Sequence, residues 1–182
     1  MAEGAERSIS RGVMVRPAKP SDAAGFVDLY RAVASERRWI QTEVVPLGER
    51  DYRRRFRHSW TTREATLVAV ADARLIGSLS ISREDRPATR HVATLGMFVA
   101  ASWRGRGVGT ALMTEAMRWG RFHGIEKIEL SVYPHNGAAK ALYRKFGFDE
   151  EGRLVRHEKK SYGYEDEILM AVWLGDGDGG RA

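Results

Sequence analysis

Seven residues, Arg104 to Thr110, restrict the possible folds of this chain more than any other segment. They read Arg-Gly-Arg-Gly-Val-Gly-Thr and lie between an apolar stretch, Ala88 to Val99, and a stretch of helical periodicity that ends at Gly124. The N-terminus of a helix offers unpaired N–H groups and a partial positive charge, and glycines let the backbone approach an anion closely. The segment therefore predicts a phosphate-binding turn between a strand and a helix.

Individual residues of this turn are expected to contribute to anion binding in different ways. Arg104 and Arg106 add full positive charges, and Thr110 adds a hydroxyl donor in the first helical turn. A Cβ atom at Gly107 or Gly109 would stand where a diphosphate must lie. The residues alone also allow a second interpretation, in which the segment is a tight turn that binds nothing.

Two other glycine-rich motifs do not fit the segment. A Rossmann turn needs Gly-x-Gly-x-x-Gly directly after a first strand, with an acidic residue about twenty positions later. Gly105, Gly107 and Gly109 have a different spacing and come late in the chain. A Walker loop needs Gly-Lys followed by Ser or Thr, which the chain lacks. Dinucleotide binding of the Rossmann type and Walker-type nucleotide binding are therefore disfavoured.

Composition limits the remaining classes of protein. A chain of 182 residues with 43% hydrophobic and 30% charged residues fits one globular domain. The absence of Cys excludes disulfides, thiolate zinc sites and cysteine nucleophiles, and the five His have no ligand spacing, so we expect no metal. No apolar run is long enough for a membrane span, and Met1 to Gly12 lacks the apolar core of a secretory signal. We expect a cytoplasmic protein without a membrane partner.

The net charge of +6 raises the possibility of a nucleic-acid partner. Much of the excess lies in two clusters, Arg50 to His58 and Arg153 to Lys160, and neither belongs to a helix-turn-helix, zinc-finger or RNA-binding motif. A polyanionic cofactor accounts for some basic residues near its site. We therefore expect solvated basic faces and no nucleic acid.

Apolar periodicity predicts a single domain over residues 13–174, with flexible ends at 1–12 and 175–182. The expected element order is β-α-α-β-β-β-α-β-α-β-β, a mixed central β-sheet flanked by helices, which belongs to the α/β class. The expected strands are Val13 to Arg16, Ala65 to Ala71, Leu75 to Ser82, Ala88 to Val99, Ile125 to Val132, Phe148 to Val155 and Glu165 to Leu174. The expected helices run from Ser21 through Val33, from Glu49 to about Ser59, from Val108 to Gly124 and from Gly137 to Phe146. A tight turn at Asp72-Ala73-Arg74, which lacks Gly, joins two of the strands.

The segment Arg104-Gly105-Arg106-Gly107-Val108-Gly109 matches the Arg/Gln-x-x-Gly-x-Gly/Ala motif in full, and in this the chain resembles the GCN5-related N-acetyltransferase (GNAT) family. The resemblance implies acetyl-CoA as co-substrate and a single-domain fold in which a splayed strand pair holds CoA. It implies that backbone groups at Met97, Phe98 and Val99 pair with the pantetheine arm. It also implies that the N–H groups from Gly105 to Thr110 hold the diphosphate.

A second element agrees with the same family. Asn136 to Phe148 is similar to its Asn-x-x-Ala-x-x-x-Tyr-x-x-x-Gly-Phe pattern. Asn136 is a good helix N-cap on its own chemistry, and the resemblance adds a contact to the cofactor. The resemblance also assigns Tyr143 as the general acid that returns a proton to the CoA thiolate, a task for which a phenol protonated at neutral pH is suited. A core aromatic at helical spacing is the alternative for Tyr143.

The acceptor side is less defined by the sequence. An amine must be neutral to attack a thioester, so a base or a desolvating acidic channel is expected. We favour Glu43 as the base, because Trp39 to Glu43 lies in the helix-to-helix loop that lines the acceptor side in the family. His91, Glu84, Asp85 and Thr94 are the alternatives, and each is also accounted for as a surface or structural group.

The final strand resembles a branch of the family that acetylates free amino acids and small amines, in which a hairpin closes the acceptor pocket. Tyr162, Tyr164 and Glu165 are its expected contacts to an acceptor.

Direct attack without a covalent enzyme intermediate is consistent with the absence of Cys. A protein or peptide acceptor and a CoA-binding sensor without turnover are the competing hypotheses. A homodimer is common for this fold, and the sequence does not determine the oligomeric state.

Overall fold

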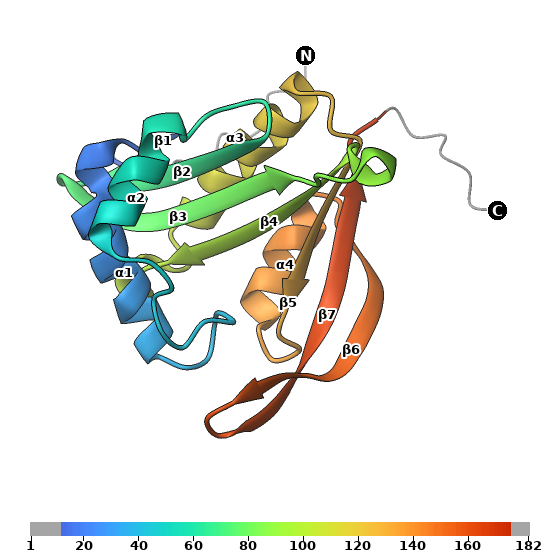
Figure 1. Cartoon of the computed structure of the whole chain (residues 1–182). Coiled ribbons are helices and arrows are strands. Elements are labelled where there is room, and N and C mark those ends of the chain that lie inside the picture. The colour runs from blue at the N-terminus through green and yellow to red at the C-terminus, as the bar shows by residue number, and fades with distance from the viewer. Residues whose placement is uncertain (1–11, 176–182) are drawn as a thin grey trace, which may run out of the picture.

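The computed structural model describes residues 12–175, so the ends expected to be flexible lie almost wholly outside the described residues. Within that range the predicted element order is confirmed (Figure 1). The strands are β1 (Met14–Pro17), β2 (Glu64–Ala71), β3 (Arg74–Arg83), β4 (Val92–Val99), β5 (Lys127–Val132), β6 (Asp149–Lys160) and β7 (Gly163–Trp173). The α-helices are α1 (Ala23–Ser35), α2 (Glu49–Arg55), α3 (Val108–Phe122) and α4 (Gly137–Lys145).

The strands form one sheet in the order β1-β2-β3-β4-β5-β7-β6. All neighbouring pairs are antiparallel except β4 and β5, which run parallel. The α/β class and the mixed sheet flanked by helices are therefore confirmed. Because β4 and β5 are parallel, the chain must cross over between them, and α3 provides the crossover.

The sheet opens between β4 and β5, which Figure 1 shows as two strand groups spreading apart. These two strands pair only over Val92–Thr94 and Lys127–Glu129, whereas β3 stays paired with β4 as far as Val99. The second half of β4 therefore has a partner on one edge and none on the other. This is the splayed strand pair that the sequence predicted.

Each face of the sheet has its own core. The helix α3 buries one apolar stripe, including Leu112, Ala116 and Trp119, against alternate residues of β2, β3 and β5. On the other face, α1 and α2 bury Phe26, Tyr52 and Phe56 against Val68 and neighbouring side chains. Phe26, Tyr52 and Phe56 of this second core also line the cavity described below.

Several predicted strands have different limits in the structure. The strand expected over Ala88 to Val99 begins only at Val92, because Pro87–Thr89 forms a short 3-10 turn. The hairpin strand expected to end at Val155 continues to Lys160, and its partner begins at Gly163 instead of Glu165. The register shifts within β6, together with its mostly exposed side chains, remove the alternating pattern that would have predicted this length.

The turn between β2 and β3 offers a stability prediction. Asp72 and Ala73 both have positive φ, at 47° and 60°, as a two-residue type I′ hairpin requires. A non-glycine residue in this region costs about 1–2 kcal/mol. We expect Ala73→Gly to raise the free energy of unfolding by about 0.5–1 kcal/mol, after allowance for the greater freedom of glycine in the unfolded chain. The midpoint of thermal unfolding should rise by roughly 1–4 °C. Ala88→Gly, at an exposed residue of the 3-10 turn, is the control and should lower it.

Candidate active site

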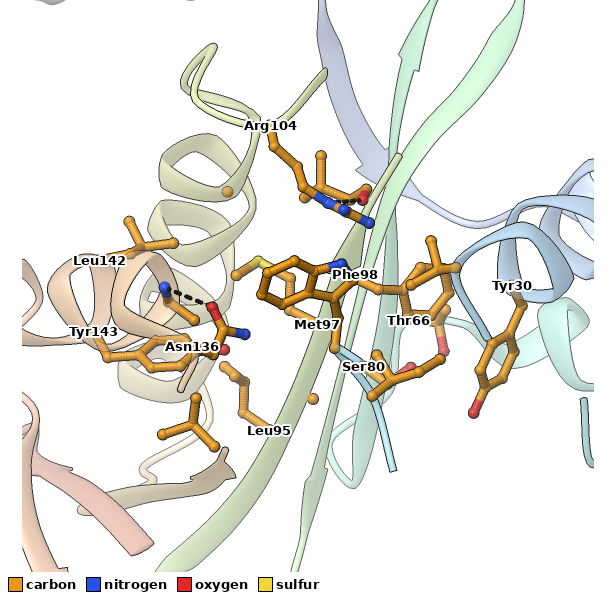
Figure 2. A pocket seen from close by; sticks show the side chains of 18 of the residues that line it. Tyr30, Thr66, Ser80, Leu95, Met97, Phe98, Arg104, Asn136, Leu142 and Tyr143 are labelled. Carbon is orange, nitrogen blue, oxygen red and sulfur yellow. Dashed lines mark hydrogen bonds between the residues drawn. The ribbon is translucent and has the colours of Figure 1, made fainter. Parts of the chain in front are cut away.

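A cavity of about 1610 Å³ occupies the opening between β4 and β5 and extends to both faces of the sheet. Figure 2 shows Asn136, Leu142 and Tyr143 on one side of β4, and Tyr30, Thr66 and Ser80 on the other. One half of the cavity is therefore bounded by α3 and α4, and the other half by α1, α2 and the loop that joins them. We call the first half the cofactor side and the second half the acceptor side, after the roles that the resemblance implies for them.

The free edge of β4 faces the cavity. The N–H of Ala100 donates to the carbonyl of Ile76, and that of Glu84 donates to the carbonyl of Val92, each at 2.9 Å. In an antiparallel pair, every second residue of a strand forms backbone hydrogen bonds to the neighbouring strand. The even-numbered residues of β4 therefore bond to β3. The backbone groups of Leu95, Met97 and Val99 therefore point into the opening. Of the predicted backbone contacts, Met97 is available there, Val99 offers its N–H because its carbonyl accepts from Arg104, and Phe98 is used by β3.

The glycine-rich turn lies at the wide end of this opening. Gly105 and Gly107 have positive φ, at 74° and 83°, and a Cβ at either position would meet no atom within 4 Å. Gly107 is the N-cap of α3, and no side chain caps the first N–H groups of that helix. The turn therefore presents open space beside free N–H donors, which is the geometry that an anionic group needs.

The structural reason for a glycine at Gly109 differs from the one predicted. A Cβ there would lie 2.9 Å from Cδ2 of Leu142 and 3.5 Å from Cε of Met97. Gly109 is therefore required for close packing of α3 against α4 and β4. The space that the sequence assigned to a diphosphate at this position is taken by the Leu142 side chain, whereas the space at Gly107 is open.

The two arginines of the turn are held by neighbours. The guanidinium of Arg104 donates to both carboxylate oxygens of Glu36, at 2.6 and 2.7 Å, and through Nε to the carbonyl of Val99 at 3.0 Å. The pKa of Glu36 is lowered by this contact. Arg104 therefore ties the turn to the end of α1, and its charge is largely balanced. Arg106 stacks on Trp103, with 5.4 Å between the guanidinium carbon and the ring centroid.

The helix α4 brings Asn136 and Tyr143 to the cavity. Oδ1 of Asn136 accepts a hydrogen bond from the N–H of Ala139 at 3.2 Å, so its predicted N-cap role is confirmed (Figure 2). Tyr143 is 6% exposed, and burial raises its pKa to about 12. Its ring packs against Phe148, and its side chain lines the cavity. A phenol in this setting remains protonated at neutral pH and can donate a hydrogen bond to a group in the cavity.

The acceptor side has a polar floor, of which the sequence had singled out only Thr94. Its hydroxyl groups come from alternate positions of neighbouring strands, and they are Thr66, Ser80, Ser82 and Thr94. Tyr30 and Phe98, stacked with 4.9 Å between ring centroids, form part of one wall. A signal was present in Ser78-Leu79-Ser80-Ile81-Ser82, where serines alternate with buried apolar residues along one strand.

The predicted base candidates occupy different places. Glu43 accepts hydrogen bonds from the hydroxyl and N–H of Ser161, at 2.9 and 3.3 Å, and it lies outside the cavity lining. His91 stacks on Trp173, and Asp85 pairs with Arg63. Thr94 does line the cavity, and its hydroxyl lies 3.4 Å from carboxylate oxygens of Glu84 and Glu129. The carboxylate that lines the acceptor side is instead Glu167 of β7.

The loop between α1 and α2 is joined to the β6–β7 hairpin. The hydroxyl of Tyr162 donates to the carbonyl of Arg37 at 3.1 Å, and Nζ of Lys160 donates to the carbonyl of Gln41. With the bonds of Glu43 to Ser161, these contacts form a bridge between the hairpin and a loop whose residues Trp39 to Thr42 line the acceptor side. In Figure 1 this loop leaves α1 and reaches toward the projecting hairpin.

Among residues 12–175 no helix combines the length and apolarity that crossing a membrane requires. In the same range, no group of three or more His, Cys, Asp or Glu side chains is arranged to hold a metal ion.

Comparison with known proteins agrees with this geometry. The model of the acetyltransferase (GNAT) family matches residues 29–148. The L-amino acid N-acetyltransferase AaaT of Escherichia coli is 36% identical over 124 residues, which cover 63% of this chain and 75% of that protein. The range matched by the family model includes the glycine-rich turn, Asn136 and Tyr143, whereas β6 and β7 lie beyond it.

Solved structures share the fold over almost the full length. The crystal structure of a GNAT-family acetyltransferase from Streptococcus pneumoniae has a TM-score of 0.83 and 26% identity, covering 90% of this chain and 99% of that one. The acetyltransferase yncA of Salmonella typhimurium, solved with its cofactor acetyl-CoA, has a TM-score of 0.82 and 16% identity, covering 92% and 96%. The similarity therefore extends to the hairpin that the family model leaves out.

Proposed function

Because the chain belongs to the GNAT family of acetyltransferases, acetyl-CoA is its co-substrate and N-acetyl transfer its reaction, and we propose that the acceptor is the primary amine of an amino acid or of a similarly small molecule. The cavity supports this assignment because a cofactor side and an acceptor side meet between β4 and β5.

The residues of the cofactor side are suited to acetyl-CoA. The free N–H groups at the start of α3 and the open space at Gly105 and Gly107 fit its diphosphate. The edge of β4 that β5 leaves unpaired offers the N–H and carbonyl of Met97 and the N–H of Val99 to the amides of the pantetheine arm, as one strand does to another. An arm held along this edge directs its thioester toward the narrow end of the opening, near Leu95 and Thr94.

The reaction that fits this arrangement is direct attack of a neutral amine on the acetyl carbon. The nitrogen forms a bond to that carbon, the carbon–sulfur bond breaks, and the sulfur takes up a proton. Tyr143 is our proposed proton donor, since its protonated hydroxyl lines the cofactor side. The chain has no Cys to carry a thioester intermediate, in agreement with a direct route.

The observation that carries the choice of a small acceptor is the bridge between the loop after α1 and the β6–β7 hairpin. We infer that this bridge closes one end of the acceptor side, because the loop that it anchors supplies Trp39 to Thr42 of the cavity lining. A long peptide segment needs a groove that is open at both ends, whereas a small amine needs only one entrance. The name of the E. coli relative, an L-amino acid N-acetyltransferase, points in the same direction.

The test compares acceptors by release of free CoA thiol. We expect thiol release from acetyl-CoA with at least one free amino acid or small primary amine, and little with peptides that carry the same residue at an N-terminus or as internal lysine. A preference for peptides would assign a protein acceptor instead. Stabilisation by acetyl-CoA without turnover on any amine would indicate a binding module.

A further inference from the structure

The acceptor side contains a polar cluster built by three adjacent strands. In β5, Ile128, Leu130 and Val132 point into the core against α3, so Ser131 and Tyr133 point to the opposite face. The register places Glu167 of β7 and the pair Glu158 and Lys160 of β6 on that same face. The hydroxyl of Tyr133 donates to Glu158 at 2.5 Å, which links β5 to β6.

Glu167 is the member of this cluster that reaches the cavity. It is 4% exposed and lines the acceptor side. The amide of Gln41, in the loop that bridges this side, donates to its Oε1 and also to Oγ of Ser131 at 3.0 Å. The carboxylate is therefore held in position by the loop and by β5.

The charges of the cluster do not balance within the described residues. Lys160 pairs with Glu158 at 2.7 Å, donates to the carbonyl of Gln41 and lies over the ring of Tyr133. Glu167 has the negative charge of Glu158 beside it, and no salt bridge joins it to a cation in residues 12–175. A buried carboxylate without a cationic partner costs free energy even when an amide donates to it, so this position favours either a proton or an added cation.

Glu167 also lies close to the place where an acetyl group must arrive. Ser131 is the second residue of β5 after Glu129, the last one paired with β4. Ser131 therefore lies inside the opening, close to its narrow end, toward which the pantetheine arm points. Gln41 bonds to both Ser131 and Glu167, which places this carboxylate beside the same end.

We propose that Glu167 binds the ammonium group of the acceptor and takes a proton from it before the nitrogen attacks the acetyl carbon. This inference rests on the proposed acetyl transfer to an amine. The ammonium supplies the cation that the cluster lacks. Proton transfer then leaves a neutral Glu167 beside a neutral amine, so no unpaired charge remains buried.

The proton balance of the reaction is complete with this assignment. The ammonium gives one proton to Glu167, and the resulting amine forms the carbon–nitrogen bond. When the carbon–sulfur bond breaks, sulfur receives a proton from Tyr143, which regains one from the acylated nitrogen. Glu167 releases its proton to solvent, so that ammonium and acetyl-CoA give the amide, CoA thiol and one proton.

The acidity of the site supports the same role. Burial and the neighbouring charge of Glu158 raise the pKa of Glu167 above its ordinary value, although the hydrogen bond from Gln41 acts in the opposite direction. Burial also acts to raise the pKa of Glu158, but the hydrogen bonds from Lys160 and Tyr133 keep it lowered. The ionisable groups on the elements packed around Glu167 are Glu158, Lys160, Tyr133, Glu165, His135 and Glu43. A base with a raised pKa is better matched to a proton held by an amine.

The first test is Glu167→Gln, which keeps the shape of the side chain and removes its charge. We expect kcat/KM for the acceptor to fall about 100-fold, within the range of general-base catalysis. Acetyl-CoA should still raise the midpoint of thermal unfolding as in the wild type. Binding of the amine to the protein saturated with CoA, measured by calorimetry, should weaken at least tenfold. Asp166→Asn is the matched control, because Asp166 directly precedes Glu167 in β7 and pairs with Arg153 at the surface.

The second test uses the pH profile. Since the base acts only when ionised, kcat/KM should fall as the pH drops through the pKa of Glu167. Glu158→Gln removes a neighbouring negative charge and should move this acid limb to lower pH, whereas Glu167→Gln should remove the limb. If the wild type acetylates amines but the pH profile is unchanged in both variants, the role of Glu167 is overturned while the proposed function stands. Loss of the limb in Glu43→Gln would also overturn it and assign the base to Glu43. Failure of the wild type on every amine would reject the proposed function itself.

Discussion

Replacement of Tyr143 by Phe should lower kcat about 10²- to 10⁴-fold, the usual range for removal of a general acid. The hydroxyl lies on the cofactor side of the cavity, and the leaving thiolate would otherwise take its proton from water. The ring accounts for the packing of this residue, through its contact with Phe148, and the variant keeps the ring. Steady-state rates at saturating acetyl-CoA and amine measure the effect.

A loss of catalysis must be separated from a loss of structure in this variant. The thermal midpoint of Tyr143→Phe and its stabilisation by acetyl-CoA should match those of the wild type, because no hydrogen bond of the hydroxyl exists among residues 12–175. The pKa of Tyr143 near 12 also predicts no loss of the acid form below about pH 11. A rate that is unchanged in Tyr143→Phe would remove this tyrosine from the mechanism.

Replacement of Gly107 by Leu should weaken acetyl-CoA binding at least about 100-fold. The new side chain would enter the open space at the N-terminus of α3 and exclude the diphosphate from the helix N–H groups. Loss of two charge-assisted hydrogen bonds, each about 1.5–3 kcal/mol, accounts for that factor. At an acetyl-CoA concentration of 100 times the wild-type Kd, stabilisation should fall from about 2.7 to about 0.4 kcal/mol or less.

Gly124→Leu provides the matched control for backbone strain. Gly124 has a φ of 66° at the other end of α3, and its Cβ would also meet no atom within 4 Å. Both variants should therefore lose about 1–2 kcal/mol of stability, while only Gly107→Leu should lose the response to acetyl-CoA. An equal response to acetyl-CoA in the two variants would place the diphosphate elsewhere.

The cofactor side could be predicted from the sequence because its parts are local. The residues from Met97 to Thr110 form one strand, one turn and the first turn of a helix, and each part has a chemical requirement visible in its residue types. Asn136 and Tyr143 follow on one helix at fixed spacing. Gly109 was predicted for the wrong reason, since its constraint comes from Leu142 on a different helix.

The acceptor side could not be predicted in the same way because its contacts join distant residues. Gln41 and Glu167 are 126 positions apart, and Lys160 reaches the same loop across 119 positions. In sequence, Glu167 ends the acidic run Glu165-Asp166-Glu167, which is typical of a solvated strand. Its burial follows only from the pairing of β7 with β5 and from the loop above it, and Glu43 was favoured because it lies in that loop.

Initial rates with acetyl-CoA and an amino acid varied together test the central claim most directly. Direct transfer in one cavity predicts intersecting lines in reciprocal plots, with one acetylated amine formed for each CoA thiol released. It also predicts no acetyl group on the protein after incubation with acetyl-CoA alone. Parallel lines together with an acetylated protein, or thiol release that does not depend on the amine, would contradict this account.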